Sequence, residues 1–213
     1  PSSLLHTEGY DIHKTTFKKI YNNKKIFWFL ITYIFYADAM MTIAFFVTLY
    51  LSKALNFTEG AIKIGGVVFL LGTILGGFFT RFLQRYDQTR SLNVLLILWP
   101  ILLFITTLFS NHILVVASFG LTGIVFSMVF AVSRSFYSSL VPVAERAEYF
   151  SVYVIFERMG AIFGPLIWSS VSSIFFFLGE SAAYRIAMIT TAVITAGSTL
   201  SFRKIQKMKN PHP

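Results

Sequence analysis

A single acidic residue inside a long apolar run is the first feature of this sequence that could do chemistry. Asp38 lies in the run from Ile26 to Leu51, which carries no other charge. A charged carboxylate at the centre of a membrane helix costs roughly 2.5–3.5 kcal/mol on insertion scales, so Asp38 must face protein or water. We expect it to bind a proton or a solute, with Thr42 one turn further along the same helix face. The alternative is a structural carboxyl that bonds a neighbouring helix.

Two further charges, Glu157 and Arg158, lie next to each other in a second apolar region. If that span begins near Tyr149, Arg158 lies about 14 Å deep and could pair with Asp38 or bind a solute carboxylate. Glu157 would then be a helix-contact or coupling residue. If the apolar core begins at Met159 instead, both side chains reach the membrane surface. The apolar residues at 150–156 favour the deeper placement.

Glycine pairs at a spacing of four indicate where helices approach closely. Gly72 and Gly76 form one such pair, and Gly160 and Gly164 form another. Pro165 follows the second pair directly and should loosen or kink its helix.

The elements that must position these residues are membrane helices. Of the 213 residues, 55% are apolar and 13% are charged, whereas soluble domains carry about 25% charged residues. The sequence therefore predicts an all-α polytopic membrane protein. We expect six transmembrane helices between basic tails at 1–25 and 203–213, with spans at about 26–51, 62–82, 92–109, 113–132, 149–178 and 185–202.

The distribution of basic residues predicts the orientation of these spans. With six spans, one side holds both tails and the loops after the second and fourth spans, together with most Lys and Arg residues. The other side holds only Lys53, Lys63 and Arg185. By the positive-inside rule, both termini are predicted to be cytoplasmic. The short loops favour a bacterial inner membrane, and the basic segment 14–25 is either a surface helix or a solvated linker.

Several function classes are disfavoured by composition. The net charge of +9 is spread over tails and loops, which favours anionic lipid headgroups over nucleic acid as the partner. The chain has no Cys, and its four His lie in tails or a turn, so we expect no metal site and no cofactor. Intramembrane hydrolysis would need further groups at the depth of Asp38, so we expect no enzyme.

The segment from Ser133 to Leu166 carries a more specific pattern. Its order of residues is Ser133-Arg134-Ser135, Leu140-Val141-Pro142, Ala147-Glu148-Tyr149-Phe150 and Gly164-Pro165-Leu166. It resembles a segment of the vacuole-effluxer-like branch of the major facilitator superfamily, which includes an autophagy-related amino-acid effluxer. The stretch Tyr36-Ala37-Asp38 is similar to the start of that family's seventh helix. Ser151, Ala39 and Arg158 depart from the family pattern, which favours Gly, Gly and Lys there.

This resemblance implies the C-terminal six-helix half of a transporter with two six-helix bundles and a solute site between them. A small polar solute, for example an amino acid, would cross by alternating access. The missing N-terminal half would lie upstream in a longer chain or be supplied by a second copy; the start at Pro1 suggests a fragment. Arg134, Glu145 and Glu148 would form cytoplasmic gate contacts.

Two rival functions remain open from the sequence. The first is the membrane domain of an ATP-driven exporter, which would need long cytoplasmic helix extensions and a nucleotide-binding partner. The second is a membrane scaffold without transport activity, in which helix packing fills the space around Asp38.

Overall fold

Long helices make up nearly the whole of the computed structural model, which describes residues 16–83 and 85–208. A helical segment at 16–22 leads into α2 (Lys24–Leu49), which a π-helical turn, Tyr50–Ala54, extends. The remaining long helices are α3 (Glu59–Leu83), α4 (Gln88–Leu108), α5 (His112–Leu140), α6 (Arg146–Ile174) and α7 (Glu180–Lys207). Six helices are long and apolar enough to cross a membrane. This confirms the predicted all-α polytopic membrane fold.

The helix boundaries follow from capping residues in the short connections. Asn23 caps α2, Asp87 caps α4 and Asn111 caps α5, each accepting a hydrogen bond from a backbone N–H of the first turn. These caps satisfy donors that have no partner within the helix. Gly179, between α6 and α7, has a φ of 97°, a conformation that glycine adopts without steric cost.

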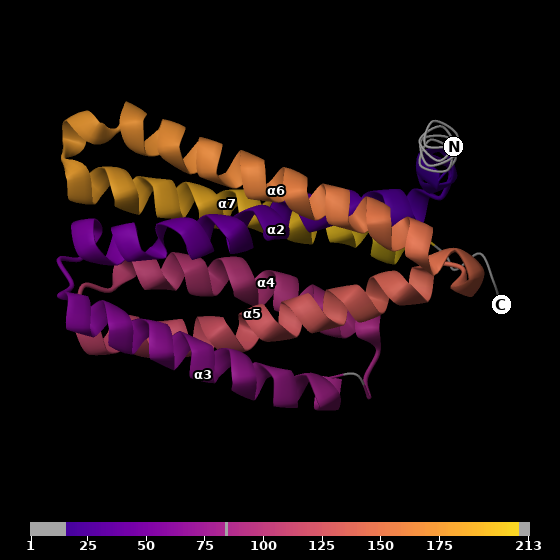
Figure 1. Ribbon diagram of the computed structural model, residues 1–213, viewed down its shortest axis with the longest axis horizontal. Coiled ribbons are helices and arrows are strands. Elements are labelled where there is room, and N and C mark those ends of the chain that lie inside the picture. The colour runs from indigo at the N-terminus through magenta and orange to yellow at the C-terminus, as the bar shows by residue number, and fades with distance from the viewer. Residues whose placement is uncertain (1–15, 84, 209–213) are drawn as a thin grey trace, which may run out of the picture.

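The helices pack in two groups, α3–α5–α4 and α7–α2–α6, which meet mainly through α4 and α7. In Figure 1, α3 and α6 lie at opposite margins of the bundle. The α3 helix packs mainly on α5 and α6 packs mainly on α2, while α4 and α7 pack on each other and against α5 and α2 respectively. The α3–α4 and α5–α6 connections lie at the same end as the segment 16–22 and the end of α7 (Figure 1).

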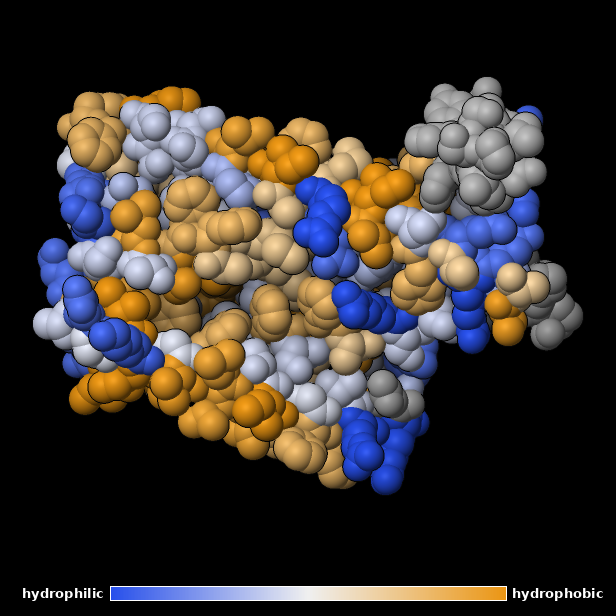
Figure 2. All heavy atoms as spheres, in the orientation of Figure 1, coloured by the Kyte–Doolittle hydropathy of each residue, from blue (hydrophilic) through white to orange (hydrophobic). Residues whose placement is uncertain are grey.

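The surface of the helical bundle is typical of a membrane protein. Figure 2 shows apolar side chains along the length of the helices, with hydrophilic residues concentrated at the two ends. Large apolar side chains are exposed on the broad face of α3 that points away from α5: Ile64, Val67, Leu70, Leu71, Ile74, Leu75, Phe78, Phe79 and Phe82. Such a surface needs lipid or another helical bundle as its neighbour.

The α6 helix bears on the open question about Glu157 and Arg158. It begins at Arg146, so both residues lie well inside a continuous helix that qualifies as a span. At 1.5 Å per residue, Glu157 is about 16 Å from the start of α6. The depth of these residues in a bilayer stays a prediction.

Candidate functional site

Asp38 is buried at the centre of α2. Its residue is only 4% exposed, and its carboxylate Oδ1 has no hydrogen-bond partner among the described residues. The Thr42 hydroxyl donates to the backbone carbonyl of Asp38 at 2.8 Å and therefore does not satisfy the carboxylate. A buried oxygen without a partner is costly, so it needs either a proton or a solute group to bind.

The backbone of α6 covers Asp38 directly. A Cβ atom on Gly160 would lie 3.0 Å from the Asp38 backbone nitrogen. A Cβ on Gly164 would lie 2.8 Å from Asp38 Oδ1 and would overlap the Thr42 hydroxyl. We call this contact, formed by Gly160, Gly164, Asp38 and Thr42, the α6–α2 seam. Pro165 follows it inside α6, where it lacks the N–H that would bond the carbonyl of Ala161.

A second glycine contact joins α3 to α5. Added Cβ atoms on Gly72 and Gly76 would overlap the backbone carbonyl oxygens of Gly120 and Ile124, and one on Gly123 would overlap that of Phe69. We call this contact the α3–α5 seam. Its α5 glycines, spaced by three, were not part of the sequence prediction.

Arg158 does not reach Asp38. It is exposed, and no ion pair involving it is found among the described residues. The pairing that the deeper placement allowed is therefore absent. The reason is helical phase: Arg158 lies about 200° around α6 from Gly160, which faces Asp38.

Glu157 pairs with Arg134 instead. Its Oε2 lies 3.7 Å from an Arg134 guanidinium nitrogen, which joins α6 to α5. The Arg134 side chain is 50% exposed and lies over the Phe130 ring at 4.4 Å, whereas that of Glu157 is 19% exposed. The structure thus brings together one residue expected at the gate and one expected at the solute site.

Glu145 and Glu148 contact the N-terminal segment rather than Arg134. Lys19 donates to Glu145 Oε1 at 2.7 Å, and the Thr16 hydroxyl donates to Glu148 Oε2 at 2.9 Å. The hydrogen bond to Glu145 raises the pKa of Lys19. Ile20 is buried in the same contact region, so the segment 16–22 is attached to the α5–α6 connection.

A cluster of tyrosines between α2, α5 and α6 was missed by the sequence analysis. The Tyr33 and Tyr153 rings stack at 4.1 Å, and Tyr36 and Tyr137 lie 5.1 Å from Tyr33 and Tyr153 respectively. The hydroxyls of Tyr33, Tyr36 and Tyr153 are buried and lie near one another and near Ser133, but no hydrogen bond of good geometry is found for them among the described residues. Because membrane tyrosines usually lie at the interfaces, tyrosines in mid-span were the signal that could have identified this cluster.

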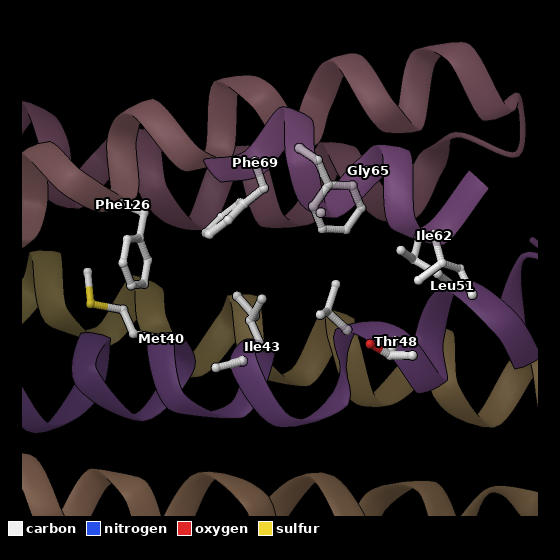
Figure 3. Close-up of a pocket in the computed structure, with 12 residues that line it drawn as sticks. Met40, Ile43, Thr48, Leu51, Ile62, Gly65, Phe69 and Phe126 are labelled. Atoms are coloured by element: carbon white, nitrogen blue, oxygen red, sulfur yellow. The ribbon is translucent and has the colours of Figure 1, made fainter. Parts of the chain in front are cut away.

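An apolar cavity of about 150 Å³ is lined in part by α2, but Asp38 is not among its lining residues. It lies between α2, α3 and α5, with the Ile43 and Phe69 side chains facing each other across it (Figure 3). Its lining residues are Met40, Ile43, Ala44, Val47, Thr48, Leu51, Ile62, Gly65, Gly66, Phe69, Phe119 and Phe126. With a single hydroxyl in its lining, the cavity is suited to apolar atoms and not to a charged solute.

Comparison with known proteins gives a consistent result. A family model described as "Vacuole effluxer Atg22 like" matches residues 5–202. The chain is also similar to YxiO of Bacillus subtilis (strain 168), which is described as an uncharacterized MFS-type transporter. The two are 25% identical over 186 residues, which cover 84% of this chain and 41% of the relative. The chain thus spans less than half the length of this curated relative.

Proposed function

The chain belongs to the vacuole effluxer Atg22-like family, and from this premise we propose that it forms one six-helix half of a secondary transporter of the major facilitator type. The transported solute is small and polar, and amino acids are the first class to test. Transport proceeds by alternating access, as two six-helix halves rock around a solute site at the membrane midplane. The second half lies elsewhere in a longer chain or comes from a second copy.

The observation that carries this proposal is the buried, unpartnered carboxylate of Asp38. An ionisable group inside a span is expensive and usually serves a pathway for ions or solutes. Asp38 lies where α6 crosses α2 over two glycines, next to the proline in α6. Small movements of α6 would therefore uncover the carboxylate and let it exchange a proton or meet the solute.

The proposed orientation places the basic end of the bundle in the cytoplasm. That end holds the segment 16–22, the α3–α4 and α5–α6 connections and the end of α7, which carry most of the Lys and Arg residues. These cations would bind anionic lipid headgroups of a bacterial inner membrane. The other six-helix half would cover part of the apolar surface that α3 and α6 expose.

A membrane scaffold without transport activity is the second candidate. The packing of Gly160 and Gly164 over Asp38 favours it, because the backbone of α6 lies directly against the carboxylate. The ATP-driven exporter is not favoured, since the family match and the similar protein both point to a different transporter class.

The test is transport by the full-length protein in proteoliposomes, comparing wild type with Asp38→Asn. We expect solute counterflow to fall by about tenfold or more and its pH dependence to flatten, because an amide cannot carry a proton on and off. Asp87→Asn is the matched control: it changes an aspartate in a connection, where asparagine still caps α4. Unchanged counterflow and pH dependence in Asp38→Asn would remove Asp38 from the mechanism. Failure of the wild type to move any solute in a panel would support the scaffold.

A further inference from the structure

We propose that the exposed face of α6 around Arg158 is a docking surface for a transmembrane helix from the remaining part of a longer chain, and that this helix carries a carboxylate opposite Arg158. The inference rests on the proposed function, in which a second six-helix half completes the transporter. It deepens that function by naming the helix face, its cation and the chemistry of the partner.

The surface is a stripe along one side of α6 with Arg158 in its middle. Residues at 154/155, 158/159, 162/163 and 166 follow one another at a spacing of four, so they lie along one side of the helix. All except Arg158 are large apolar residues that are 37–60% exposed: Val154, Ile155, Met159, Ile162, Phe163 and Leu166. Figure 2 shows hydrophilic residues over α6 between the two ends of the bundle, surrounded by apolar side chains.

Arg158 finds no counter-charge within the described part of the chain. No ion pair involving it occurs among the described residues, and its neighbour Glu157 pairs with Arg134 on α5. None of the residues three or four positions away on α6 is acidic. Asp38 lies against the opposite side of α6, at Gly160 and Gly164. The partner of Arg158 must therefore come from outside these residues.

The position of Arg158 along α6 disfavours acyl chains as its neighbour. The helix runs from Arg146 to Ile174, so Arg158 lies two positions from the middle residue, Gly160. It is about 18 Å from the start of the helix and about 24 Å from its end. A bilayer core about 30 Å thick and centred on α6 would leave Arg158 about 12 Å from the nearer headgroup region. Arginines at such depth face protein or water.

The exposed face of α4 provides a contrast. Its exposed apolar residues are Val94, Leu98, Ile101 and Phe104, and no charged residue follows Arg90 in this helix. A charge-free apolar face is compatible with lipid alone. The two faces have similar exposure, so the cation is what distinguishes α6 as a protein-binding surface.

The charge and the chain length together define the partner. A carboxylate is the side-chain group that complements a guanidinium, with which it can form two parallel hydrogen bonds. The apolar residues around Arg158 would exclude solvent from this pair, as in the centre of other protein interfaces. The 186 residues that match the Bacillus subtilis relative are 41% of its length, so most of that protein lies outside the matched region. This remainder is long enough to supply further helices.

The first experiment identifies the neighbour of α6 in the full-length protein in membranes. The photo-reactive residue p-benzoylphenylalanine replaces either Ile162, which is 60% exposed beside Arg158, or Ile101 of α4, which is 46% exposed. We expect the probe at Ile162 to form a cross-link to a peptide of the same chain outside the 213 residues, identified by mass spectrometry. The probe at Ile101 is the matched control and should capture lipid.

The second experiment tests the charge. Arg158→Glu should lower the thermal midpoint of the full-length protein by about 3 °C or more, because two carboxylates would then face each other. Changing the acidic residue within one turn of the cross-linked position to Lys should restore at least half of this loss. Arg158→Lys should retain most of the wild-type midpoint. Arg203→Glu, a charge reversal at the exposed end of α7, is the control and should change the midpoint less.

The outcomes separate this inference from the proposed function. Capture of lipid by the probe at Ile162, a cross-link between two copies of the chain, or a cross-linked helix without an acidic residue within one turn would each overturn the inference, while transport by the wild type would still stand. Loss of transport in Arg158→Gln with an unchanged thermal midpoint would assign Arg158 to the solute and also overturn it. If the predicted cross-link and rescue occur but the wild type moves no solute, the docking surface stands and the proposed function fails. Because the probe at Ile162 leaves Arg158 in place, the first experiment does not depend on the folding of Arg158→Glu.

Discussion

The α3–α5 seam and the α6–α2 seam are equivalent in arrangement but different in chemistry. When the helices are divided in chain order into α2–α4 and α5–α7, the second helix of each group packs on the first helix of the other, α3 on α5 and α6 on α2. In the α3–α5 seam, glycines on both helices bring backbone against backbone, and no charged group is present. In the α6–α2 seam, glycines occur on α6 alone, and they lie against the backbone of Ala37 and Asp38 and against the side chains of Asp38 and Thr42.

This difference separates a fixed contact from one that can respond. A backbone carbonyl cannot move away from a new Cβ without shifting a helix, whereas a threonine hydroxyl can rotate or be removed. The unpartnered Asp38 carboxylate adds a group whose interactions change with its protonation or with a bound solute. On the proposed function, we therefore expect the first seam to serve stability and the second to serve transport.

The largest expected effect is in the α3–α5 seam. Gly76→Ala places a Cβ 3.0 Å from the carbonyl carbon and Cα of Ile124 and in overlap with its oxygen. We expect the free energy of unfolding to fall by about 1–3 kcal/mol, the usual range for overpacking. The measurement is thermal or denaturant unfolding in detergent.

The adjacent glycine supplies the control for this variant. A Cβ on Gly77 would meet only the Ser127 hydroxyl, at 3.8 Å. Gly77→Ala should therefore be neutral, or stabilising by up to about 1 kcal/mol through helix propensity. Equal destabilisation by both variants would contradict the account of this seam as a specific backbone contact.

The second prediction concerns rescue in the α6–α2 seam. Gly164→Ala should lower the free energy of unfolding by about 1–2 kcal/mol, because the new Cβ overlaps the Thr42 hydroxyl. Combining it with Thr42→Ala removes that oxygen and should restore part of the loss, with a coupling of at least about 0.5 kcal/mol. Rescue should be partial because the Asp38 backbone oxygen remains 2.8 Å from the Cβ. Strict additivity in the double-mutant cycle would show that this seam is as rigid as the other.

The third prediction separates function from stability at Asp38. Since Oδ1 has no partner, Asp38→Asn should keep the free energy of unfolding within about 1 kcal/mol of wild type or raise it, while transport is lost. Unfolding and counterflow measured on the same preparation test this. A loss of more than about 2 kcal/mol would indicate that the carboxyl bonds a neighbouring helix, which was the structural alternative.

The sequence was sufficient for those features that depend on local signals. Span length and hydropathy predict the six helices, and the spacing of Gly160 and Gly164 indicates a close contact without naming its partner. Helical phase also contained the answer for Arg158, since residues two positions apart on a helix point in nearly opposite directions.

Other features depend on how helices far apart in the chain pack on one another, and these contacts could not be predicted from a single sequence. Arg134 meets Glu157 only because of how α5 and α6 are placed relative to each other. The tyrosine cluster requires α6 to pack on α2, since Tyr33 and Tyr153 are far apart in the chain. Likewise, the contacts of Glu145 with Lys19 and of Glu148 with Thr16 join segments far apart in the chain, and the gate role expected for the two acids stays a prediction.

The smallest expected effect concerns the Lys19–Glu145 ion pair, which lies outside the two seams at the ends of α2 and α6. The contact of Lys19 with Glu145 joins the segment before α2 to the connection before α6, so it links the adjoining ends of the two helices that form the α6–α2 seam. Lys19→Gln should increase amide hydrogen exchange in residues 16–22 and the first turn of α6, and leave the α3–α5 seam unchanged. The effect should be small and should weaken with salt, because exposed ion pairs are screened.

The pH dependence of this attachment follows from the raised pKa of Lys19. A group whose pKa is higher in the folded protein contributes stability that is fully present below its ordinary value of 10.5 and is lost as pH rises through the folded value. Wild type should therefore differ from Lys19→Gln at neutral pH and converge with it only in strongly alkaline solution. If the exchange rates of wild type and Lys19→Gln already agreed near neutral pH, or if exchange changed equally at both seams, the Lys19–Glu145 pair would not stabilise the α6–α2 seam. Any difference between the two seams would then have to arise from Asp38 and Thr42 alone.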